Sequence, residues 1–278
     1  MMLSRLHPRA STDLPDGRLR SRADEALVRL AGGVFWYGEA RGAETMARWL
    51  EEARRDGGPP EVEADFIGFL AGQVDDERRH AALWADWLVR RGIPMPPGGA
   101  VSAARRPDRH PRLPSPPRSI VRLMDWQDDA PTWAERLTTT HLTIEALSLH
   151  LYAALRDLVD PDTGAVLAAI HADEGRHVSG GAEWARRLLR ADPRGVHAAR
   201  RAVSRAMWLN LRTVAATVPL LVALGVDVRR LATSTSRAVP RRLRDVGIEP
   251  PRWTVMLGLA GRRQSGGTGH SAANGSFP

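Results

Sequence analysis

Hydrophobic residues recur every three or four positions through most of this chain, which is the spacing of one face of an α-helix. Long helical patterns cover about residues 22–55, 62–91, 132–159, 165–190 and 196–224, and shorter ones follow at 228–238 and 240–246. No segment alternates between polar and apolar residues as a half-buried strand does. We therefore expect an all-α protein.

Helix-breaking residues divide these patterns into two hairpins. Gly57-Gly58-Pro59-Pro60 separates the first two helices, and Asp160-Pro161-Asp162-Thr163-Gly164 separates the next two. Between the hairpins, residues 92–119 are rich in Pro and Arg, which favours an extended crossover outside the core. The order predicts a four-helix bundle with one long crossover over residues 21–191 and additional C-terminal helices packed on it over 192–262. We expect disordered tails at 1–20 and 263–278.

One five-residue pattern, Asp-Glu-x-Arg-His, occurs twice, at residues 76–80 and 173–177. In each copy a glutamate and a histidine stand three positions apart, so both point the same way from a helix. Two such pairs, with one further glutamate from each of two other helices, form the ligand set of a dinuclear metal site in a bundle.

Both copies lie on apolar stripes, so their glutamates and histidines should face the core. One stripe consists of Phe66, Leu70, Gln73, Glu77, His80, Trp84 and Leu88; the other consists of Leu167, Ile170, Glu174, His177 and Gly181. Buried carboxylates are costly unless they are paired or bound to metal, and a pair of cations would compensate them.

The two remaining glutamates should come from the first and third helices. Glu145 is the only acid between Glu135 and Asp157, and it shares a stripe with His141 and Tyr152. On the first helix Glu39 shares an apolar face with Phe35, Gly42, Met46 and Trp49, whereas the alternative, Glu44, lies on a more polar face. We favour Glu39 and keep Glu44 as the alternative.

The repeated pattern also supplies residues that could support the ligands. A metal-bound histidine usually donates its second N–H to a carboxylate. Asp76 and Asp173, each directly before a glutamate, are placed to accept such a bond across the bundle, and Arg79 and Arg176 could neutralise them.

The composition excludes several kinds of site and partner. The 278 residues include no Cys, which excludes disulfides, thiolate metal sites and a cysteine nucleophile. The net charge of +8 arises from arginines spread along the chain, and it suits either a solvated surface or an acidic partner. No nucleic-acid recognition motif, membrane-spanning run or signal-peptide pattern is evident, so we expect a cytoplasmic protein.

The doubled pattern resembles the ferritin-like dinuclear-iron carboxylate oxygenases and oxidases over about residues 25–190. This group includes acyl-carrier-protein desaturases, soluble methane monooxygenase hydroxylases and relatives of the ribonucleotide reductase small subunit. The resemblance implies two Fe, with Mn possible at one position. It also implies one set of ligands: Glu39, Glu77, His80, Glu145, Glu174 and His177.

Other residues acquire roles only through this resemblance. Ser148 stands where desaturases have a threonine that could relay a proton to bound oxygen. His171 is a candidate extra ligand, and His141 is a weaker one. Tyr152 could hold a radical or bond a ligand carboxylate. The short chain, the Pro-rich crossover and the region after Arg190 depart from the desaturase pattern.

The leading hypothesis is an oxygen-dependent di-iron enzyme that hydroxylates, desaturates or N-oxygenates an organic substrate held in an apolar channel. Its electrons would come from a ferredoxin or flavin reductase, and an acyl group on an acidic acyl carrier protein is one candidate substrate. The alternatives are iron storage and a metal-free scaffold. Dimers are common in the families that the pattern resembles, and the sequence leaves a homodimer open.

Overall fold

The computed structural model describes residues 21–56, 63–96, 101 and 112–252, and these are helical with no strand among them. The first hairpin begins with α1 (Arg22–Leu30), continues through the π-helical segment η1 (Ala31–Trp36) into α2 (Tyr37–Asp56), and returns along α3 (Glu63–Arg90). The turn predicted at residues 57–60 and both predicted tails lie outside the described residues, as do residues 253–262.

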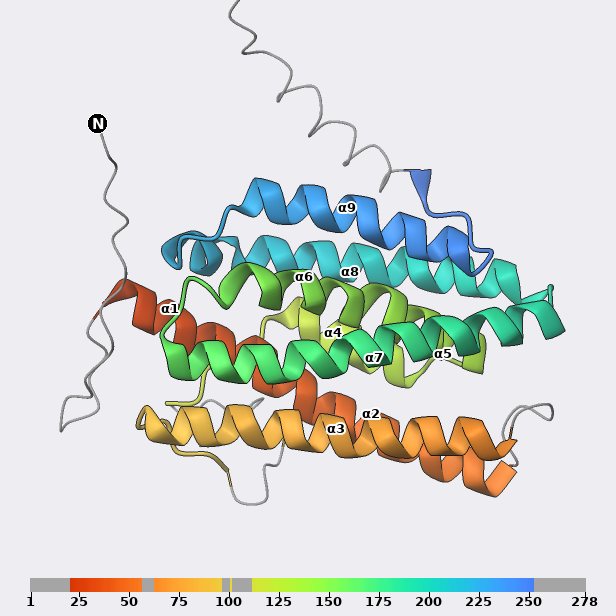
Figure 1. Ribbon diagram of the computed structural model, residues 1–278, viewed down its shortest axis with the longest axis horizontal. Coiled ribbons are helices and arrows are strands. Elements are labelled where there is room, and N and C mark those ends of the chain that lie inside the picture. Colours follow the sequence, from red (N-terminus) through yellow and green to blue (C-terminus); the bar gives the residue numbers. More distant parts are fainter. Residues whose placement is uncertain (1–20, 57–62, 97–100, 102–111, 253–278) are drawn as a thin grey trace, which may run out of the picture.

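The second hairpin contains α5 (Trp133–Thr139), η4 (Thr140–Glu145) and α6 (Ala146–Leu155), followed by α7 (Pro161–Ala191). Helix α7 begins four residues earlier than expected, because Asp160 caps it by accepting a bond from the Thr163 N–H and Pro161 occupies its first turn. Figure 1 shows α2 and α3 as one layer, with α6 and α7 lying over it.

The crossover differs from the expectation of an extended segment outside the core. Val101 and Leu113 are buried in the main core cluster, and residues 118–128 form an additional helix, α4 (Arg118–Asp128). Pro114 lies so close to Gly32 that a Cβ on Gly32 would come within 2.7 Å of the proline ring. The apolar residues among the prolines therefore anchor this segment on η1.

Two long helices follow the bundle, where the sequence predicts one long helix and two shorter ones. They are α8 (Gly195–Ala223) and α9 (Val228–Asp245), and α9 runs on through Pro240 where two shorter helices were expected. Helix α8 packs on α1, α4 and α5, whereas α9 packs mainly on α6. In Figure 1 both lie on the side of the second hairpin that faces away from α2 and α3.

Among the described residues, α8 is the one helix that is long and apolar enough to span a membrane, judged by length and composition alone. Its mean hydropathy over the best window is 1.4. One such helix is weak evidence, because core helices of soluble proteins pass the same test. Helix α8 does bury one face on the bundle.

The predicted stripes are the buried faces of their helices. All seven stripe residues of α3 are buried, including Gln73, Glu77 and His80. The stripes of α2, α6 and α7 are buried as well, which brings Glu39, Glu145, Glu174 and His177 into the bundle. Polar side chains thus occupy the middle of an otherwise apolar interior.

Candidate metal centre

The helices that contribute single glutamates each contain a π-helical segment, whereas α3 and α7 are regular. Segment η1 ends three residues before Glu39, and η4 ends on Glu145 itself. A π segment inserts an extra residue into a turn, so it rotates the side chains that follow it, and such segments are frequent at functional sites. Sequence periodicity did not reveal either segment.

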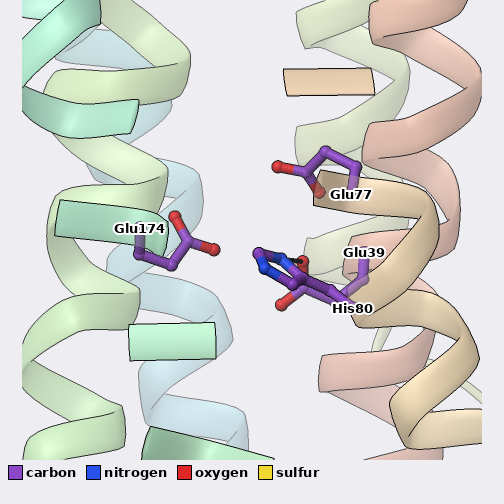
Figure 2. Close-up of side chains that lie close together, drawn as sticks. All are labelled: Glu39, Glu77, His80 and Glu174. Carbon is purple, nitrogen blue, oxygen red and sulfur yellow. Dashed lines mark hydrogen bonds and ion pairs between the residues drawn. The ribbon is translucent and has the colours of Figure 1, made fainter. Parts of the chain in front are cut away.

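Six acidic and imidazole side chains converge in the bundle. One group that could hold an ion consists of Glu39, Glu77, His80 and Glu174, and a second consists of Glu77, Glu145 and His177. Within each group the candidate ligand atoms lie within 4.8 Å of one another. Figure 2 shows Glu174 pointing from one side of the bundle toward Glu77, His80 and Glu39 on the other. Because Glu77 belongs to both groups, the two positions are adjacent.

Each histidine joins the two hairpins through the aspartate of the other copy of the repeated pattern. His80 Nε2 lies 3.1 Å from Asp173 Oδ2, and His177 Nε2 lies 3.1 Å from Asp76 Oδ2. Such bonds leave the Nδ1 atoms directed at the carboxylates, in the carboxylate–histidine arrangement common around metals.

Two arginines compensate these aspartates. Arg79 binds both Asp76 and Asp173, its Nη2 lying 2.7 Å from Asp173 Oδ2. Arg176 also binds both, at 3.2 Å from Asp76 and 2.5 Å from Asp173. Burial acts to raise the pKa of Asp173, but bonds from His80, Arg79 and Arg176 hold it at about 2. The aspartates are therefore ionised and suited to fix the imidazole rings.

Glu39 is held by a phenol. The Tyr152 hydroxyl donates to Glu39 Oε1 at 2.6 Å, while His80 Nδ1 lies 3.3 Å from Oε2. Burial acts to raise the pKa of Glu39, but the bonds from His80 and Tyr152 keep it below its ordinary value. Burial, with the nearby Glu39 charge, raises the pKa of Tyr152 well above its usual range, so the phenol stays protonated and donates.

Glu145 is held differently, by an amide and an imidazole. Gln73 Nε2 donates to Glu145 Oε1 at 2.8 Å, and His141 Nδ1 lies 2.6 Å from Oε2. The sequence analysis assigned Gln73 no role, although an amide within an apolar stripe indicates a buried polar contact. His141, predicted as a weaker candidate for an extra ligand, contacts the carboxylate of the candidate ligand Glu145.

Two glycines make room for these side chains. A Cβ on Gly42 would lie 2.8 Å from Glu77 Oε2, and a Cβ on Gly181 would lie 2.1 Å from the His141 ring. Real Cβ atoms do not approach so closely, so Gly42 makes room for the Glu77 carboxylate and Gly181 for the imidazole next to Glu145.

The carboxylates cannot all be charged without compensation. Burial, followed by the charge of Glu39, raises the pKa of Glu77 well above its ordinary value. Burial and the charge of Glu145 raise the pKa of Glu174 in the same way. Without cations these two glutamates would hold protons, and bound cations would displace those protons.

Unpaired atoms in this cluster fit a pair of bound metal ions. Within the described chain, Glu174 Oε2 and His177 Nδ1 are buried without a hydrogen-bond partner. His177 Nδ1 lies 3.7, 3.9 and 3.8 Å from carboxylate oxygens of Glu77, Glu145 and Glu174. These separations are too long for hydrogen bonds, but they suit ligand atoms that each lie about 2 Å from a shared cation. The cluster can therefore hold metal.

Three other candidates from the sequence lie apart from the cluster. Glu44 is exposed and pairs with Arg41 at 3.0 Å. His171 belongs to neither metal group; burial, with the charge of Arg156, lowers its pKa. The Ser148 hydroxyl donates to the Ile144 carbonyl at 3.3 Å within its own helix, so its proton-relay role remains a prediction.

Comparisons with known proteins place the fold. Neither the protein-family models nor the curated protein sequences gave a match to this chain. Among solved structures, a Synechococcus protein with aldehyde deformylating oxidase activity has a TM-score of 0.64. It is 21% identical, and the match covers 90% of this chain and 98% of that one. This chain has a ferritin-like fold.

A second solved structure is a mutant of an R2-like ligand-binding oxidase with an aerobically reconstituted Mn/Fe cofactor. It is 17% identical with a TM-score of 0.45, over 88% of this chain and 82% of its own. At 21% identity the likeness to the Synechococcus protein shows a shared fold and not a shared substrate.

Proposed function

We propose that this protein is an oxygen-dependent oxidoreductase that holds two iron ions, or one manganese and one iron, and oxidises an organic substrate. The observation that carries the proposal is the His177 Nδ1 atom, buried and unpaired among three carboxylates. Oxygen-rich sites with imidazole ligands suit iron and manganese better than zinc. Glu39, Glu77, His80, Glu145, Glu174 and His177 would hold the ions.

When bound, such a pair of ions supplies the electrons that activate molecular oxygen. The chain's own residues prepare the site. Asp76 and Asp173 fix the ring orientation of His177 and His80, while Tyr152 holds Glu39 and the pair Gln73 and His141 holds Glu145. Ligands that are already oriented lose little freedom on binding metal.

Apolar and aromatic side chains exclude water on both sides of the cluster. Phe35 and Trp84 stack with ring centroids 5.0 Å apart, and Phe35 also meets Tyr152 edge-on at 5.1 Å. On another side Phe69 contacts His141 edge-on, with ring centroids 5.6 Å apart. An organic substrate that reached this interior would be shielded from solvent, which favours oxidation of the substrate over unproductive oxygen reduction.

The reaction requires electrons from outside. Hydroxylation of a C–H group consumes one oxygen molecule, two electrons and two protons, and it yields the alcohol and one water. Desaturation consumes the same electrons and protons and yields an alkene and two waters. A ferredoxin or a flavin reductase is the class of donor we propose.

We propose two substrate classes for screening. One is an acyl group on a carrier protein. The other is an aldehyde, which the aldehyde deformylating oxidase activity of the Synechococcus neighbour suggests.

Aerobic reconstitution tests this function. The purified chain is loaded with ferrous iron without oxygen, its bound iron is measured, and oxygen uptake is followed after mixing with air. We expect about two irons per chain and rapid uptake of oxygen. Many irons per chain would instead indicate storage, and a chain that binds none would be a scaffold. Either result would overturn the proposed function.

The substrate is then sought by mass spectrometry. Carrier-bound and free acyl chains, amines and aldehydes are incubated with the iron-loaded chain, a reductant and ¹⁸O₂. Incorporation of ¹⁸O identifies hydroxylation or N-oxygenation, whereas a loss of two hydrogens identifies desaturation. Glu77→Ala serves as the inactive control, because Glu77 belongs to both metal groups.

A further inference from the structure

One face of α8 exposes large apolar side chains between arginines. Trp208 is 54% exposed and Leu211 is 37% exposed. Arg201, Arg205 and Arg212 are exposed at positions three to seven residues from Trp208, so they share its side of the helix. We call these five residues the α8 outer face. Large apolar groups among cations are typical of a surface that binds a partner.

Charged residues are distributed unevenly between two opposite sides of the molecule. Helix α8 contains no acidic residue, and α9 contains one, Asp245 at its end, with Asp227 as its cap and Glu249 after it. Six arginines lie on α9: Arg229, Arg230, Arg237, Arg241, Arg242 and Arg244. The exposed acids Glu44, Glu51 and Asp75 lie instead on α2 and α3, on the opposite side in Figure 1. The α8 and α9 layer is therefore suited to an acidic partner.

Helix α8 packs against η4, the segment that carries Glu145. On the inner side of α8, next to Trp208, Leu209 is buried with Ala206 and Leu123. Ile144 packs against this cluster, and it directly precedes Glu145 in η4. Trp208 and the proposed ligand Glu145 therefore lie on two segments, α8 and η4, that pack directly on each other.

We propose that the α8 outer face docks an acidic one-electron carrier protein that reduces the metal centre. This inference rests on the proposed function, which needs two external electrons per turnover. Two reduced carriers would dock in turn, and each would be oxidised by one electron. Together with two protons from water, they balance the conversion of a C–H group and oxygen into an alcohol and water. The arginines would steer the carrier, and Trp208 and Leu211 would supply the apolar contact.

Two other occupants fit this face less well. A second copy of the chain would bring the same arginines face to face, and like charges at an interface cost several kcal/mol. A helix that lies on a membrane separates its cations from its apolar stripe. On α8 Arg205 and Arg212 flank Trp208 along one face, so apolar and cationic groups are interleaved.

The test measures electron delivery to the iron-loaded full chain without oxygen. A reduced plant-type [2Fe–2S] ferredoxin, which is acidic, is mixed with the oxidised chain, and its oxidation is followed by stopped-flow absorbance. The variant Arg205→Glu/Arg212→Glu reverses charge beside Trp208. The matched control, Arg229→Glu/Arg230→Glu, makes the same change of net charge on exposed residues of α9. Dithionite, a small reductant that needs no docking surface, shows whether each variant keeps a reducible centre.

We expect the α8 variant to be reduced by ferredoxin at least about tenfold more slowly than the α9 variant, with a weaker dependence on salt, while dithionite reduces both alike. Equal rates in the two variants, or a wild-type chain that ferredoxin does not reduce, would overturn the docking proposal alone. If the wild-type chain holds no iron, or if dithionite does not reduce the iron that it holds, the proposed function is overturned as well.

A membrane partner gives a different result. Vesicles made from equal parts of phosphatidylglycerol and phosphatidylcholine are sedimented with the wild-type chain and with both double variants. If the chain sediments with vesicles through residues Arg205 and Arg212, and ferredoxin oxidation does not depend on them, the face binds lipid and the carrier proposal is wrong. Absence of sedimentation, together with the expected ferredoxin result, supports the carrier.

Discussion

At Glu39 the supporting partner is the Tyr152 phenol, whereas at Glu145 the partners are the His141 imidazole and the Gln73 amide. The Nε2 atoms of His80 and His177 are held in the same way, each by an aspartate at 3.1 Å. The repeated pattern thus supplies the symmetric part of the centre, and residues outside it supply the difference. Both oxygens of Glu145 have partners from outside the proposed ligand set, whereas one oxygen of Glu39 has His80, itself a proposed ligand, as its partner.

Removing the glutamate that both halves share should have the largest effect. Glu77 belongs to both metal groups, so Glu77→Ala should weaken the binding of both ions by more than about 100-fold. Metal analysis after anaerobic loading with ferrous iron measures this loss. Glu44→Ala, which removes an exposed glutamate of α2, should keep about two irons per chain. Two irons retained by Glu77→Ala would exclude a site shared through Glu77.

Filling the space beside His141 should disturb only the Glu145 half. The Cβ of Gly181→Ala would overlap the His141 ring, which should destabilise the fold by about 1–3 kcal/mol and displace the ring from Glu145. Gly175→Ala is the matched control in the same helix, because its Cβ meets nothing within 4 Å and should stabilise by about 0.5–1 kcal/mol. Urea unfolding of both variants measures the contrast, and a neutral Gly181→Ala would show that the ring can move freely.

The residues of the repeated pattern, which make up the symmetric part of the centre, could be predicted from the sequence. Spacing alone placed Glu77 with His80, and Glu174 with His177, on buried stripes, because a helix repeats every 3.6 residues. The same rhythm set Glu39 on the apolar face of α2 and left Glu44 outside. The metal-binding role of these residues remains a prediction.

The different partners of Glu39 and Glu145 could not be predicted from the sequence, for physical reasons. Gln73 reaches Glu145 from α3, and such a contact depends on how helices pack rather than on spacing along one of them. His141 lies four residues before Glu145 in η4, but its spacing alone does not distinguish a partner of the carboxylate from an extra metal ligand. The π segments before Glu39 and at Glu145 break the regular period that sequence reasoning assumes. Likewise, Leu113 enters the core from a Pro-rich segment that has no periodicity. Helix α9 continues through Pro240, where local propensity alone predicts an interruption.

The two supporting aspartates should differ in their response to acid. The pKa of Asp173 is held at about 2, below its ordinary 3.8, and that of Asp76 is lowered too. A lowered pKa stabilises the fold above 3.8, and this contribution is lost as the pH falls from 3.8 toward 2. Asp173→Asn in the metal-free chain should therefore cost about 2 kcal/mol at neutral pH and progressively less in acid.

Asp76→Asn provides the comparison, because Asp76 is more exposed than Asp173, at 21% against 9% of the side chain. Its cost at neutral pH should be smaller. Urea unfolding of both variants at neutral pH and at about pH 4 and 3 measures the two costs. A cost for Asp173→Asn that does not change with pH would show that the carboxylate charge contributes nothing to stability.

The smallest effect on stability and on metal binding should come from removing the Tyr152 hydroxyl. Tyr152→Phe removes one hydrogen bond to Glu39 and leaves the ring contacts in place, so it should cost about 1 kcal/mol in unfolding free energy. Without its donor Glu39 is less well oriented, and the ion on that side should bind up to about tenfold more weakly. An anaerobic calorimetric titration with ferrous iron resolves the two binding steps.

Gln73→Leu is the matched change on the other side, because it removes the amide donor to Glu145 and keeps the size of the side chain. If the two halves are independent, Tyr152→Phe should weaken one binding step and Gln73→Leu the other. Weakening of the same step by both variants would mean that the carboxylates adjust as one unit. In that event the distinct partners of Glu39 and Glu145 would set the rigidity of the whole centre rather than the affinity of each ion.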